Sequence, residues 1–526
     1  MKKTFIYLTA LIQLSIFAQP NIVWQNEIGG NDSDAGNSIV KTADGGAIVG
    51  GSTSSNDMGI NSYHGQGDAL ITKYTTNGII EWQKCFGGAN FERIFKMIPS
   101  IEGGYVFVGT TNSNDGDVSG NHGGISSVDI LDLWIVKISV LGNIEWQKCM
   151  GGTKADVARD VIQTSDGNYI VAGDSYSSDG DLQTNFGGPD YFLTKISNTG
   201  NIIWKKSYGG SGWDYAHSLS VNTNNEIIVV GRTTSFDNDI SGFHGGEDSW
   251  VLKLNSLGNI IWKKCYGGTG GESFNSAIFD GNNWVLAGRT YSTDGDISSN
   301  NGGSGGDAWL VKIDENGTII WEKTIGGTYS EHANAVIVTA DNNLLICGSA
   351  KSNDLDFVGN TNVWNDFNED EGNGFLAKIS IDGILQWVKF IGDSNHIAEF
   401  NSISENSQGE IFTTGYIAPI TTFSENMLNL KFSNEANLVK VNDAIDFKIY
   451  PNPANTFIKI DLSNIAFTDN ISMRITSSNG QEVYSTKITQ KEFTIDVSNW
   501  SASETYFVNI LDDKGYVIET RKIVLN

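Results

Sequence analysis

The sequence predicts an all-β protein built from one four-stranded unit repeated seven times. One tryptophan recurs at intervals of 58 to 66 residues, and in six of the seven copies it begins the phrase W-x-x-x-h-G-G, where h is hydrophobic. The chain also has 61 glycines and only 6 prolines, which fits many short strands joined by tight turns. A fixed period of this size indicates stacked or radially arranged copies of one supersecondary unit. The tryptophans are Trp24, Trp82, Trp146, Trp204, Trp262, Trp321 and Trp387.

Four strands can be placed within each copy, and the fourth copy illustrates them. Short β-branched and aromatic runs bounded by Gly, Asn and Asp are typical of strands. None of these runs has a 3.6-residue period, so we expect few helices. In this copy we expect strands A to D at residues 216–221, 226–231, 249–254 and 259–264, with a long polar loop at 232–248.

Four antiparallel strands in about 58 residues match one blade of a β-propeller. We therefore expect a seven-bladed propeller over residues 19–440. An open solenoid is the alternative, but a solenoid needs polar caps at both ends, and the sequence has none that we recognise. The last copy lacks its tryptophan strand, and residues 21–24 (Asn-Ile-Val-Trp) provide one. We expect this first strand to complete the last blade, which closes the ring and removes two open sheet edges.

The parity of the strands predicts which loops share a face. In an up-down-up-down blade, the B–C loop and the D–A loop emerge on one face, and the A–B and C–D turns emerge on the other. Long loops held by a rigid scaffold are where binding residues concentrate. We therefore expect ligands to be bound on the face that carries the B–C and D–A loops.

The B–C loops repeat the pattern S-x-D-x-D. Two carboxylates two residues apart in a glycine-rich loop can face one calcium ion, with backbone carbonyls supplying further oxygens. The alternative is that these side chains bond nearby backbone amides and shape the turn. The candidate calcium ligands are Asp115, Asp117, Asp179, Asp181, Asp237, Asp239, Asp294, Asp296, Asp354 and Asp356.

The D–A loops carry an acid four residues after the second glycine. Such acids could form a ring, but a carboxylate that accepts backbone amides explains them equally well. His64, His122 and His244 share one B–C slot in different blades, and we interpret them as hydrogen-bonded loop histidines. No G-x-S-x-G, HExxH or P-loop motif is present. The acids are Asp34, Glu92, Asp156, Asp214, Glu272 and Glu331, and the seventh copy has His396.

The sixth B–C loop, at residues 357–373, departs from the repeat. An exposed tryptophan among polar groups can stack on a sugar ring, whereas the alternative is a hydrophobic plug that caps its own blade. Paired carboxylates in this loop could also hydrolyse glycosides. The candidate ligand-binding residues are Trp364, Phe367, Glu369, Asp370 and Glu371.

The last eighty residues have another pattern, with seven short alternating runs that predict a small β-sandwich at 441–526. This segment opens with Tyr450, Pro451, Asn452 and Pro453 and ends with a basic-apolar run at 521–524. It resembles the type A C-terminal sorting domain of proteins exported by the type IX secretion system of Bacteroidota. The resemblance implies that the domain is an export address read by the secretion machinery, with the four opening residues as part of the signal. The phrase at 312–321 in turn resembles the tryptophan-docking phrase of quinoprotein-type propellers, without residues for the quinone.

Residues 1–18 have the basic start and apolar run of a secretory signal peptide. The formal charge of −27 argues against nucleic acid as a partner, because phosphate binding needs clustered Lys and Arg. No later segment is apolar and long enough to cross a membrane. Three of the four cysteines occupy one slot in different copies, too far apart for disulfides, so we expect buried free thiols. They are Cys85, Cys149 and Cys265, with Cys347 outside that slot.

These observations together predict an exported, non-catalytic binding or adhesion protein of the cell surface or medium, with a glycan or a protein as ligand. One alternative is a carbohydrate-active hydrolase that uses acids of the loop face. Another is a structural spacer without a ligand. Calcium is the one cofactor that the sequence suggests.

Overall fold

The structure is a computed structural model of the chain, and it falls into two compact units, residues 1–434 and 435–526. The predicted boundary at 440/441 lies in a segment outside the described residues. The described residues are 19–57, 62–122, 131–182, 184–301, 305–360, 372–393, 395–422, 424–434, 448–451, 453–462, 472–477, 482–501, 506–511 and 517–525.

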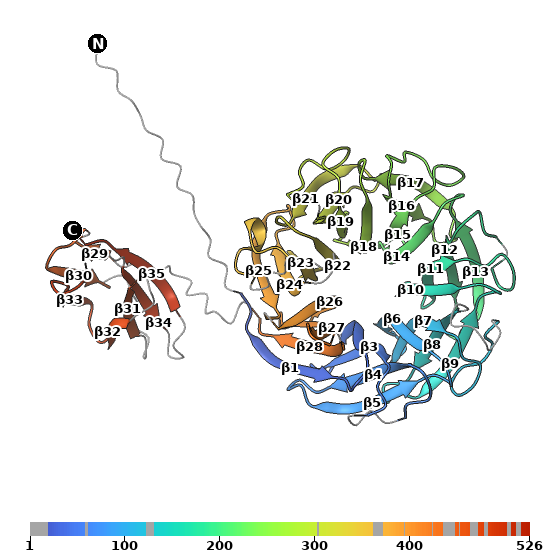
Figure 1. The fold of residues 1–526 in the computed structure, drawn as a ribbon, viewed down its shortest axis with the longest axis horizontal. Helices are drawn as coiled ribbons and strands as arrows, with labels where there is room; N and C mark the ends of the chain where they lie inside the picture. Colours follow the sequence, from blue (N-terminus) through green and yellow to red (C-terminus); the bar gives the residue numbers. More distant parts are fainter. Residues whose placement is uncertain are drawn as a thin grey trace, which may run out of the picture. The chain divides into compact units, whose positions relative to one another are not determined.

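The first unit is a closed wheel of seven four-stranded antiparallel sheets, as predicted (Figure 1). The strands nearest the axis are β2 (Asp34–Lys41), β6 (Glu92–Pro99), β10 (Asp156–Gln163), β14 (Asp214–Val221), β18 (Glu272–Phe279), β22 (Glu331–Val338) and β26 (His396–Glu405). The second strands are β3 (Ala47–Thr53), β7 (Tyr105–Thr111), β11 (Tyr169–Ser175), β15 (Ile227–Thr233), β19 (Trp284–Thr290), β23 (Leu344–Ala350) and β27 (Ile411–Pro419).

The third strands are β4 (Asp68–Tyr74), β8 (Asp132–Ile138), β12 (Asp190–Ile196), β16 (Asp248–Leu254), β20 (Asp307–Ile313), β24 (Asn373–Ile379) and β28 (Asn426–Phe432). The outermost strands are β5 (Ile80–Phe86), β9 (Ile144–Met150), β13 (Ile202–Tyr208), β17 (Ile260–Tyr266), β21 (Ile319–Ile325), β25 (Leu385–Ile391) and β1 (Ile22–Ile28). The described residues contain no α-helix, and their one helical turn is a 3-10 turn at Leu355–Phe357. The described residues contain no helix with the length and apolarity that a membrane crossing requires.

The wheel is closed by the first strand of the chain, as the sequence predicts. The seventh sheet has the order β1-β28-β27-β26, so its outermost strand comes from the other end of the wheel sequence. β1 and β28 run antiparallel, with Gln25 opposite Leu430. Just before β1, the backbone N–H of Asn21 donates to the Ser433 hydroxyl at 3.0 Å, across 412 residues of sequence. Every blade therefore has four strands, and the edge of β28 is covered by β1.

In six of the seven blades, the repeat tryptophan of the outermost strand packs on the C–D turn of the next blade. In blade 3, the indole N–H of Trp204 donates to the carbonyl of Ser256 at 3.3 Å. The same bond joins Trp24 to Thr76, Trp146 to Asn198, Trp262 to Glu315 and Trp321 to Ile381. Six of the seven junctions are thus fixed by an aromatic ring from one blade and a turn from its neighbour.

A glycine makes this approach possible. The turn glycine under Trp204 is Gly258, whose φ is +73° and whose added Cβ would lie 3.1 Å from the indole ring. Five other junctions repeat the arrangement, with φ between +69° and +87° and ring atoms 2.7 to 3.2 Å from an added Cβ. The left-handed conformation and the close contact both favour glycine over any other residue. The glycines are Gly78, Gly142, Gly200, Gly317 and Gly383.

The seventh junction is different, because blade 7 has no C–D turn. Its tryptophan, Trp387, is buried in a cluster with Leu345 and Phe400, and its indole nitrogen has no hydrogen-bond partner. The side-chain amide of Gln19 donates to the Val388 carbonyl at 2.7 Å beside it. The junction between blades 6 and 7 is therefore held by apolar packing and by the Gln19 bond in place of the repeated bond.

The hydrophobic core lies between neighbouring blades. One cluster, for example, joins Leu193 of blade 3 to Trp250 and Leu252 of blade 4. The four cysteines are free and buried, which confirms the prediction. Burial raises the pKa of the Cys85 and Cys265 thiols to about 12, so these thiols stay protonated and unreactive.

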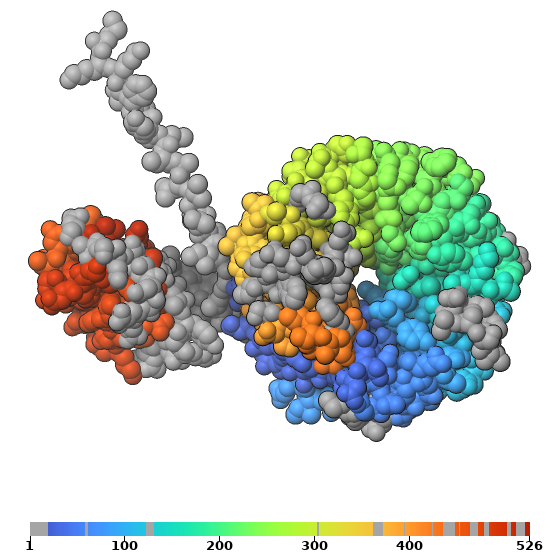
Figure 2. All heavy atoms as spheres, in the orientation of Figure 1, coloured from blue at the N-terminus to red at the C-terminus, as the bar shows by residue number. Residues whose placement is uncertain are grey.

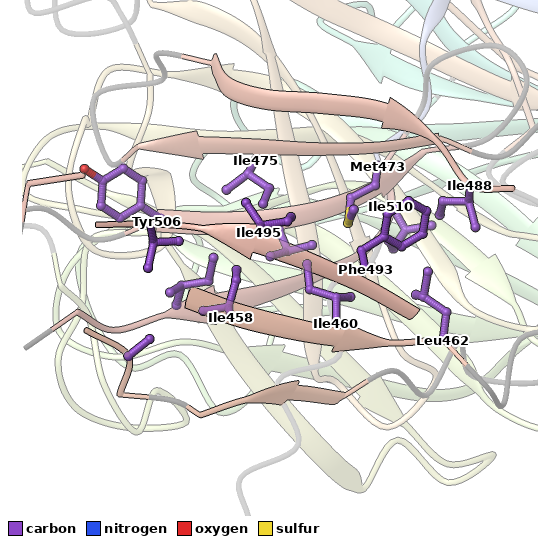
Figure 3. Close-up of a cluster of buried hydrophobic side chains, with 14 of the residues drawn as sticks. Ile458, Ile460, Leu462, Met473, Ile475, Ile488, Phe493, Ile495, Tyr506 and Ile510 are labelled. Carbon is purple, nitrogen blue, oxygen red and sulfur yellow. The ribbon is translucent and has the colours of Figure 1, made fainter. Parts of the chain in front are cut away.

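The second unit has two sheets, with the orders β29-β30-β33 and β32-β31-β34-β35. Their apolar side chains face one another, among them Ile458 and Ile460 from one sheet and Ile475 and Ile510 from the other (Figure 3). This arrangement fits the predicted small sandwich. The strands are β29 (Lys448–Tyr450), β30 (Phe457–Asp461), β31 (Ser472–Ser477), β32 (Glu482–Lys487), β33 (Glu492–Asp496), β34 (Tyr506–Leu511) and β35 (Val517–Ile523).

The tryptophan–glycine contact can be tested with Gly258→Ala. Any L-residue in the left-handed region costs about 1–2 kcal/mol, and overpacking adds typically about 1–3 kcal/mol. Gly242 is the matched control, because its φ is +80° and an added Cβ would have no atom within 4 Å. We expect Gly258→Ala to lower the denaturant midpoint clearly more than Gly242→Ala. Equal losses would mean that only the backbone conformation matters.

Candidate functional site

The B–C and D–A loops meet on one face of the wheel, as strand parity predicts. In blade 2, the backbone N–H of Ala89 donates to Oδ1 of Asp115 at 2.8 Å, and the N–H of Asn90 donates to the Ser113 hydroxyl at 2.9 Å. Ala89 and Asn90 belong to the D–A loop, whereas Ser113 and Asp115 belong to the B–C loop. Each S-x-D-x-D segment is therefore fastened to the Gly-Gly loop beside it.

The first acid of each S-x-D-x-D segment accepts a backbone amide of the D–A loop. Asp179 accepts the Thr153 N–H and hydroxyl, both at 2.8 Å, and these hydrogen bonds lower the pKa of Asp179. Asp237, Asp294 and Asp354 accept the N–H of Ser211, Thr269 and Thr328 at 2.7 to 2.9 Å. The first acids thus occupy the positions expected of turn-shaping groups.

The second acids have two kinds of partner. Asp117, Asp296 and Asp356 accept the N–H of the first loop glycine at 3.1 to 3.4 Å. Asp181 and Asp239 lie 3.5 and 3.1 Å from the ammonium groups of Lys205 and Lys263. No set of three or more His, Cys, Asp or Glu side chains is arranged to hold a metal ion within the described part of the chain.

The acids that follow the Gly-Gly loops are buried hydrogen-bond acceptors. Asp156 accepts the Gly152 N–H at 2.9 Å and the hydroxyls of Ser175 and Ser177 at 2.5 and 2.7 Å. Its equivalents Asp34, Glu92, Asp214, Glu272 and Glu331 accept the corresponding glycine N–H at 2.8 to 2.9 Å. The interpretation as amide-binding carboxylates fits all six positions.

A further buried acid starts the third strand in five blades. Asp68 accepts both the N–H and the ring nitrogen Nδ1 of His64, at 2.9 and 2.8 Å. Asp132 and Asp248 bind His122 and His244 in the same way. The three histidines are therefore hydrogen-bonded within their loops, as expected. The other oxygen of each of these acids, Oδ1, is buried without a hydrogen-bond partner, and the same holds for Oδ1 of Asp190.

Burial makes several of these carboxyls weak acids. Loss of solvent, and then the nearby charges of Asp214 and Asp239, raise the pKa of Asp190 to about 7. Loss of solvent also raises the pKa of Asp156 and Asp248 to about 6 and that of Glu331 to about 7. These shifts belong to the repeated framework of the loops, so they are not by themselves the mark of an active site.

The candidate residues of the sixth loop, Trp364, Phe367, Glu369, Asp370 and Glu371, lie outside the described residues. Of the sorting-signal residues, Asn452 also lies outside them. Tyr450 ends β29, opposite Lys459 of β30, and its side chain is exposed. Pro451 and Pro453 follow it before β30 begins.

The wheel has a polar cavity of about 470 Å³ at its axis. In the space-filling view, an opening is visible between the blades near the centre of the wheel (Figure 2). Each innermost strand has a β-bulge, for example at Arg159, between Ala158 and Asp160. A bulge re-aims a side chain, and the cavity is lined by the bulge residue of all seven blades: Asn37, Phe95, Arg159, His217, Asn275, Asn334 and Asn401.

Four of these bulge residues are asparagines that link neighbouring blades. The Asn37 amide donates to the Ile94 carbonyl of the next blade at 2.7 Å. Asn275, Asn334 and Asn401 make the same bond to Ala333, Phe400 and Gly36 at 3.0 to 3.1 Å. Nδ1 of His217 lies 3.1 Å from the equivalent carbonyl, that of Phe274. The repeat therefore uses this position as an inter-blade hydrogen bond.

Blades 2 and 3 depart from this pattern. Their bulge residues are Phe95 and Arg159, and Arg93 lies two positions before Phe95, where blade 1 has Ala35. The guanidinium carbons of Arg93 and Arg159 lie 5.0 and 4.8 Å from the centre of the Phe95 ring. These three residues put two cations on one side of the cavity.

Blade 7 places an acid on another part of the wall. Oε1 of Glu399 lies 2.6 Å from Nδ2 of Asn334 and 3.1 Å from Nε2 of His332, and Oε2 accepts the Tyr416 hydroxyl at 3.0 Å. Although loss of solvent opposes ionisation, these donors and the charge of His332 lower the pKa of Glu399. Glu399 is thus an ionised carboxylate with its hydrogen bonds supplied by the protein.

This cavity is not among the predicted sites, because its lining comes mainly from the innermost strands and the predicted sites lie on loops. The signal was present at one register of the repeat, three residues after the first acid of the innermost strand. Asparagine stands there in the first, fifth and sixth blades, and Phe95 and Arg159 break the pattern. An alignment of the seven copies by strand register would have singled out both.

Residues 448–526 match the family described as the secretion system C-terminal sorting domain. This match indicates that the chain is cargo of the type IX secretion system and is exported to the cell surface or medium. One curated relative, the uncharacterized WD repeat-containing protein L264 of Acanthamoeba polyphaga mimivirus, is 27% identical over 111 residues. That match spans 19% of this chain and 8% of the relative.

Solved structures similar to the chain include polysaccharide lyase Uly1, with a TM-score of 0.43 and 9% identity over 77% of this chain and 91% of that one. An apocarotenoid oxygenase of Synechocystis has a TM-score of 0.36 and 13% identity, over 80% and 95%. A puromycin hydrolase has a TM-score of 0.42 and 8% identity, over 91% and 59%. These likenesses carry no argument about ligand or activity.

The raised pKa values predict how stability depends on pH. Unfolded Asp and Glu titrate near pH 4, whereas the folded carboxyls hold their protons to about pH 6 or 7. The folded state therefore binds more protons than the unfolded state between these values. The stability gained from these groups is complete below about pH 4 and is lost as the pH rises through 6 to 7.

Asp190→Asn should reduce this dependence, because blade 6 already has Asn373 in the equivalent position. We expect the variant to melt at a higher temperature than wild type at pH 8, with little difference at pH 5, in thermal melts across that range. Asp382→Asn, at an exposed turn position, is the control. If the melting temperature of Asp190→Asn depended on pH as steeply as that of wild type, the raised pKa of Asp190 would not contribute to this dependence.

Proposed function

We propose that the protein is an exported, non-catalytic binding protein whose ligand is a glycan. The axial cavity carries this proposal, because its wall includes Arg93, Phe95 and Arg159, which the repeat itself does not require, and because Arg93 has no ion-pair partner among the described residues. Ligand sites are concave, with a few polar groups that fix orientation. The acids of the described loops support binding over hydrolysis, since they already accept backbone amides.

The export route has finer features that remain proposals. We propose that residues 1–18 are a signal peptide removed before Gln19, which would leave β1 whole for closure of the wheel. We also propose that the C-terminal unit is a type A sorting domain of a Bacteroidota protein, with Tyr450, Pro451, Asn452 and Pro453 as part of its signal. The opening phrase and the basic-apolar finish of this unit support that proposal.

We propose the sixth loop as an additional contact for the ligand. Its support is sequence alone: Trp364 and Phe367 lie in the irregular stretch that follows the S-x-D-x-D segment of this copy. Trp364→Ala should weaken glycan binding if the indole stacks on a sugar ring.

The binding proposal can be tested on an array of neutral and acidic polysaccharides with the full exported chain. We expect retention of at least one class of glycan without turnover, measured as bound protein and as the absence of new reducing ends. Release of products that is abolished by Glu369→Gln, Asp370→Asn and Glu371→Gln together would establish the hydrolase alternative. No retention on any array would favour the structural spacer.

Calcium in the S-x-D-x-D loops is a separate proposal with its own test. A cation that binds only the folded state must raise the melting temperature. Given the hydrogen bonds that Asp179 accepts, we expect Asp179→Ala to lower the melting temperature by a few degrees, equally in millimolar calcium and in chelator. A calcium-dependent rise in wild type that Asp179→Ala abolishes would instead support a cation site.

A further inference from the structure

We propose that the axial cavity binds the carboxylate of a sugar acid through Arg93 and Arg159. This inference rests on the proposed glycan-binding function and names the class of ligand and its site. It begins with the three residues of blades 2 and 3 that break the seven-fold pattern, Arg93, Phe95 and Arg159. Because the fold repeats without them in the other blades, they are free to serve a ligand.

Arg93 is a cation without an anionic partner. Its guanidinium donates one long hydrogen bond, 3.3 Å to Oδ1 of Asn37, and its Nε is buried without a partner. No carboxylate of the described residues lies within ion-pair distance of it. Glu399 and Glu425 also line the cavity, and their charges at longer range only partly offset the burial of Arg93. A cation without a close anionic partner is costly to bury. A bound carboxylate would supply the missing acceptor with the paired geometry that guanidinium groups favour.

Arg159 and Phe95 hold this cation in place. Arg159 donates through Nε to Asp174 at 2.9 Å, which fixes its guanidinium, and lies 4.8 Å from the Phe95 ring. Arg93 lies 5.0 Å from the same ring. Loss of solvent and the repulsion of Arg159 lower the pKa of Arg93. The ring thus separates Arg93 from the paired Arg159, and Arg93 is left as the cation that a bound anion would pair with.

The rest of the wall distinguishes a sugar acid from a bare anion or a cation. Glu399 already has three donors, so it has no need of a cationic ligand. Asn275 and Asn401 and the Tyr416 ring line the cavity with groups suited to hydroxyls. The cavity volume of about 470 Å³ falls within the usual range of about 300–1,000 Å³ for small-molecule sites. A carboxylate on a hydroxylated ring satisfies both parts of the wall.

The repeat itself provides variants that should fold. Arg93→Ala copies Ala35 of blade 1, and Phe95→Asn copies the asparagine that links blades elsewhere. We expect the double variant to be at least as stable as wild type, since it removes a buried cation and restores an inter-blade bond. Arg159 is retained, because its removal would leave Asp174 buried without a partner. Lys264→Ala, which removes a cation 5.8 Å from the Trp262 ring on an outermost strand, is the matched control for charge.

The experiment measures binding of galacturonate, glucuronate and trigalacturonate to the full chain by calorimetry, with galactose as the neutral arm. We expect the uronates to bind and galactose to bind at least tenfold more weakly. Arg93→Ala should reduce uronate affinity at least tenfold, and Lys264→Ala should leave it unchanged. Stronger binding of the trimer than of the monomers would identify a polymer as the source of the carboxylate, and equal binding would identify a free sugar acid.

The inference is overturned if the uronates do not bind, if galactose binds equally well, or if Arg93→Ala binds as wild type does. Its failure can be told apart from failure of the proposed function. If wild type and Arg93→Ala bind the same glycan on the array equally well, the protein is still a glycan-binding protein, and only the axial site is contradicted. If wild type bound no glycan on the array, the proposed function would be contradicted as well.

Discussion

The packing of one tryptophan on the turn glycine of the next blade is the interaction on which the wheel depends. A sheet of four strands has two apolar faces, and it can bury both only between two neighbours. The indole ring sets the spacing of those neighbours. The hydrogen bond from its N–H to the turn carbonyl sets their relative position along the axis of the wheel. Because the contact is repeated around the ring, small differences in each blade are held to one common geometry. The seven bulge residues then meet at the axis.

The repeated residues and the unique residues have separate roles. The acids, serines and glycines of the loops recur in blade after blade, and they bind one another and the backbone. They hold the loops in place and leave few polar groups uncommitted on the described part of that face. The residues that occur once are gathered at the axis, on β6 and β10 against β26. A symmetric scaffold thus carries an asymmetric charge distribution, with cations on two blades and the two acids Glu399 and Glu425 on a third.

Much of the fold could be predicted from the sequence, because the same pattern of residues recurs in each blade. The tryptophan spacing located every blade, and the missing strand near residue 436 pointed to Trp24 as its replacement. Strand ends differed from expectation by one or two residues, as in β15 and β17. The cavity could not be found in the same way. Whether Arg93 lines an axis or a surface depends on a bulge, and a bulge in a strand leaves no composition signal. The ten loop acids were recognised, but whether they bind backbone or cation depends on distances that spacing does not give.

The pairing of β1 with β28 has a consequence for how the molecule matures. Residues separated by 412 positions must meet before the seventh blade exists, so the final step cannot begin until nearly the whole wheel sequence is available. Contacts of such long range slow folding, because chain entropy is lost before the contact is gained. Until then, β28 exposes an unpaired edge capable of recruiting a strand from another molecule. The order of synthesis therefore leaves a period in which the nearly finished ring needs protection from its own copies.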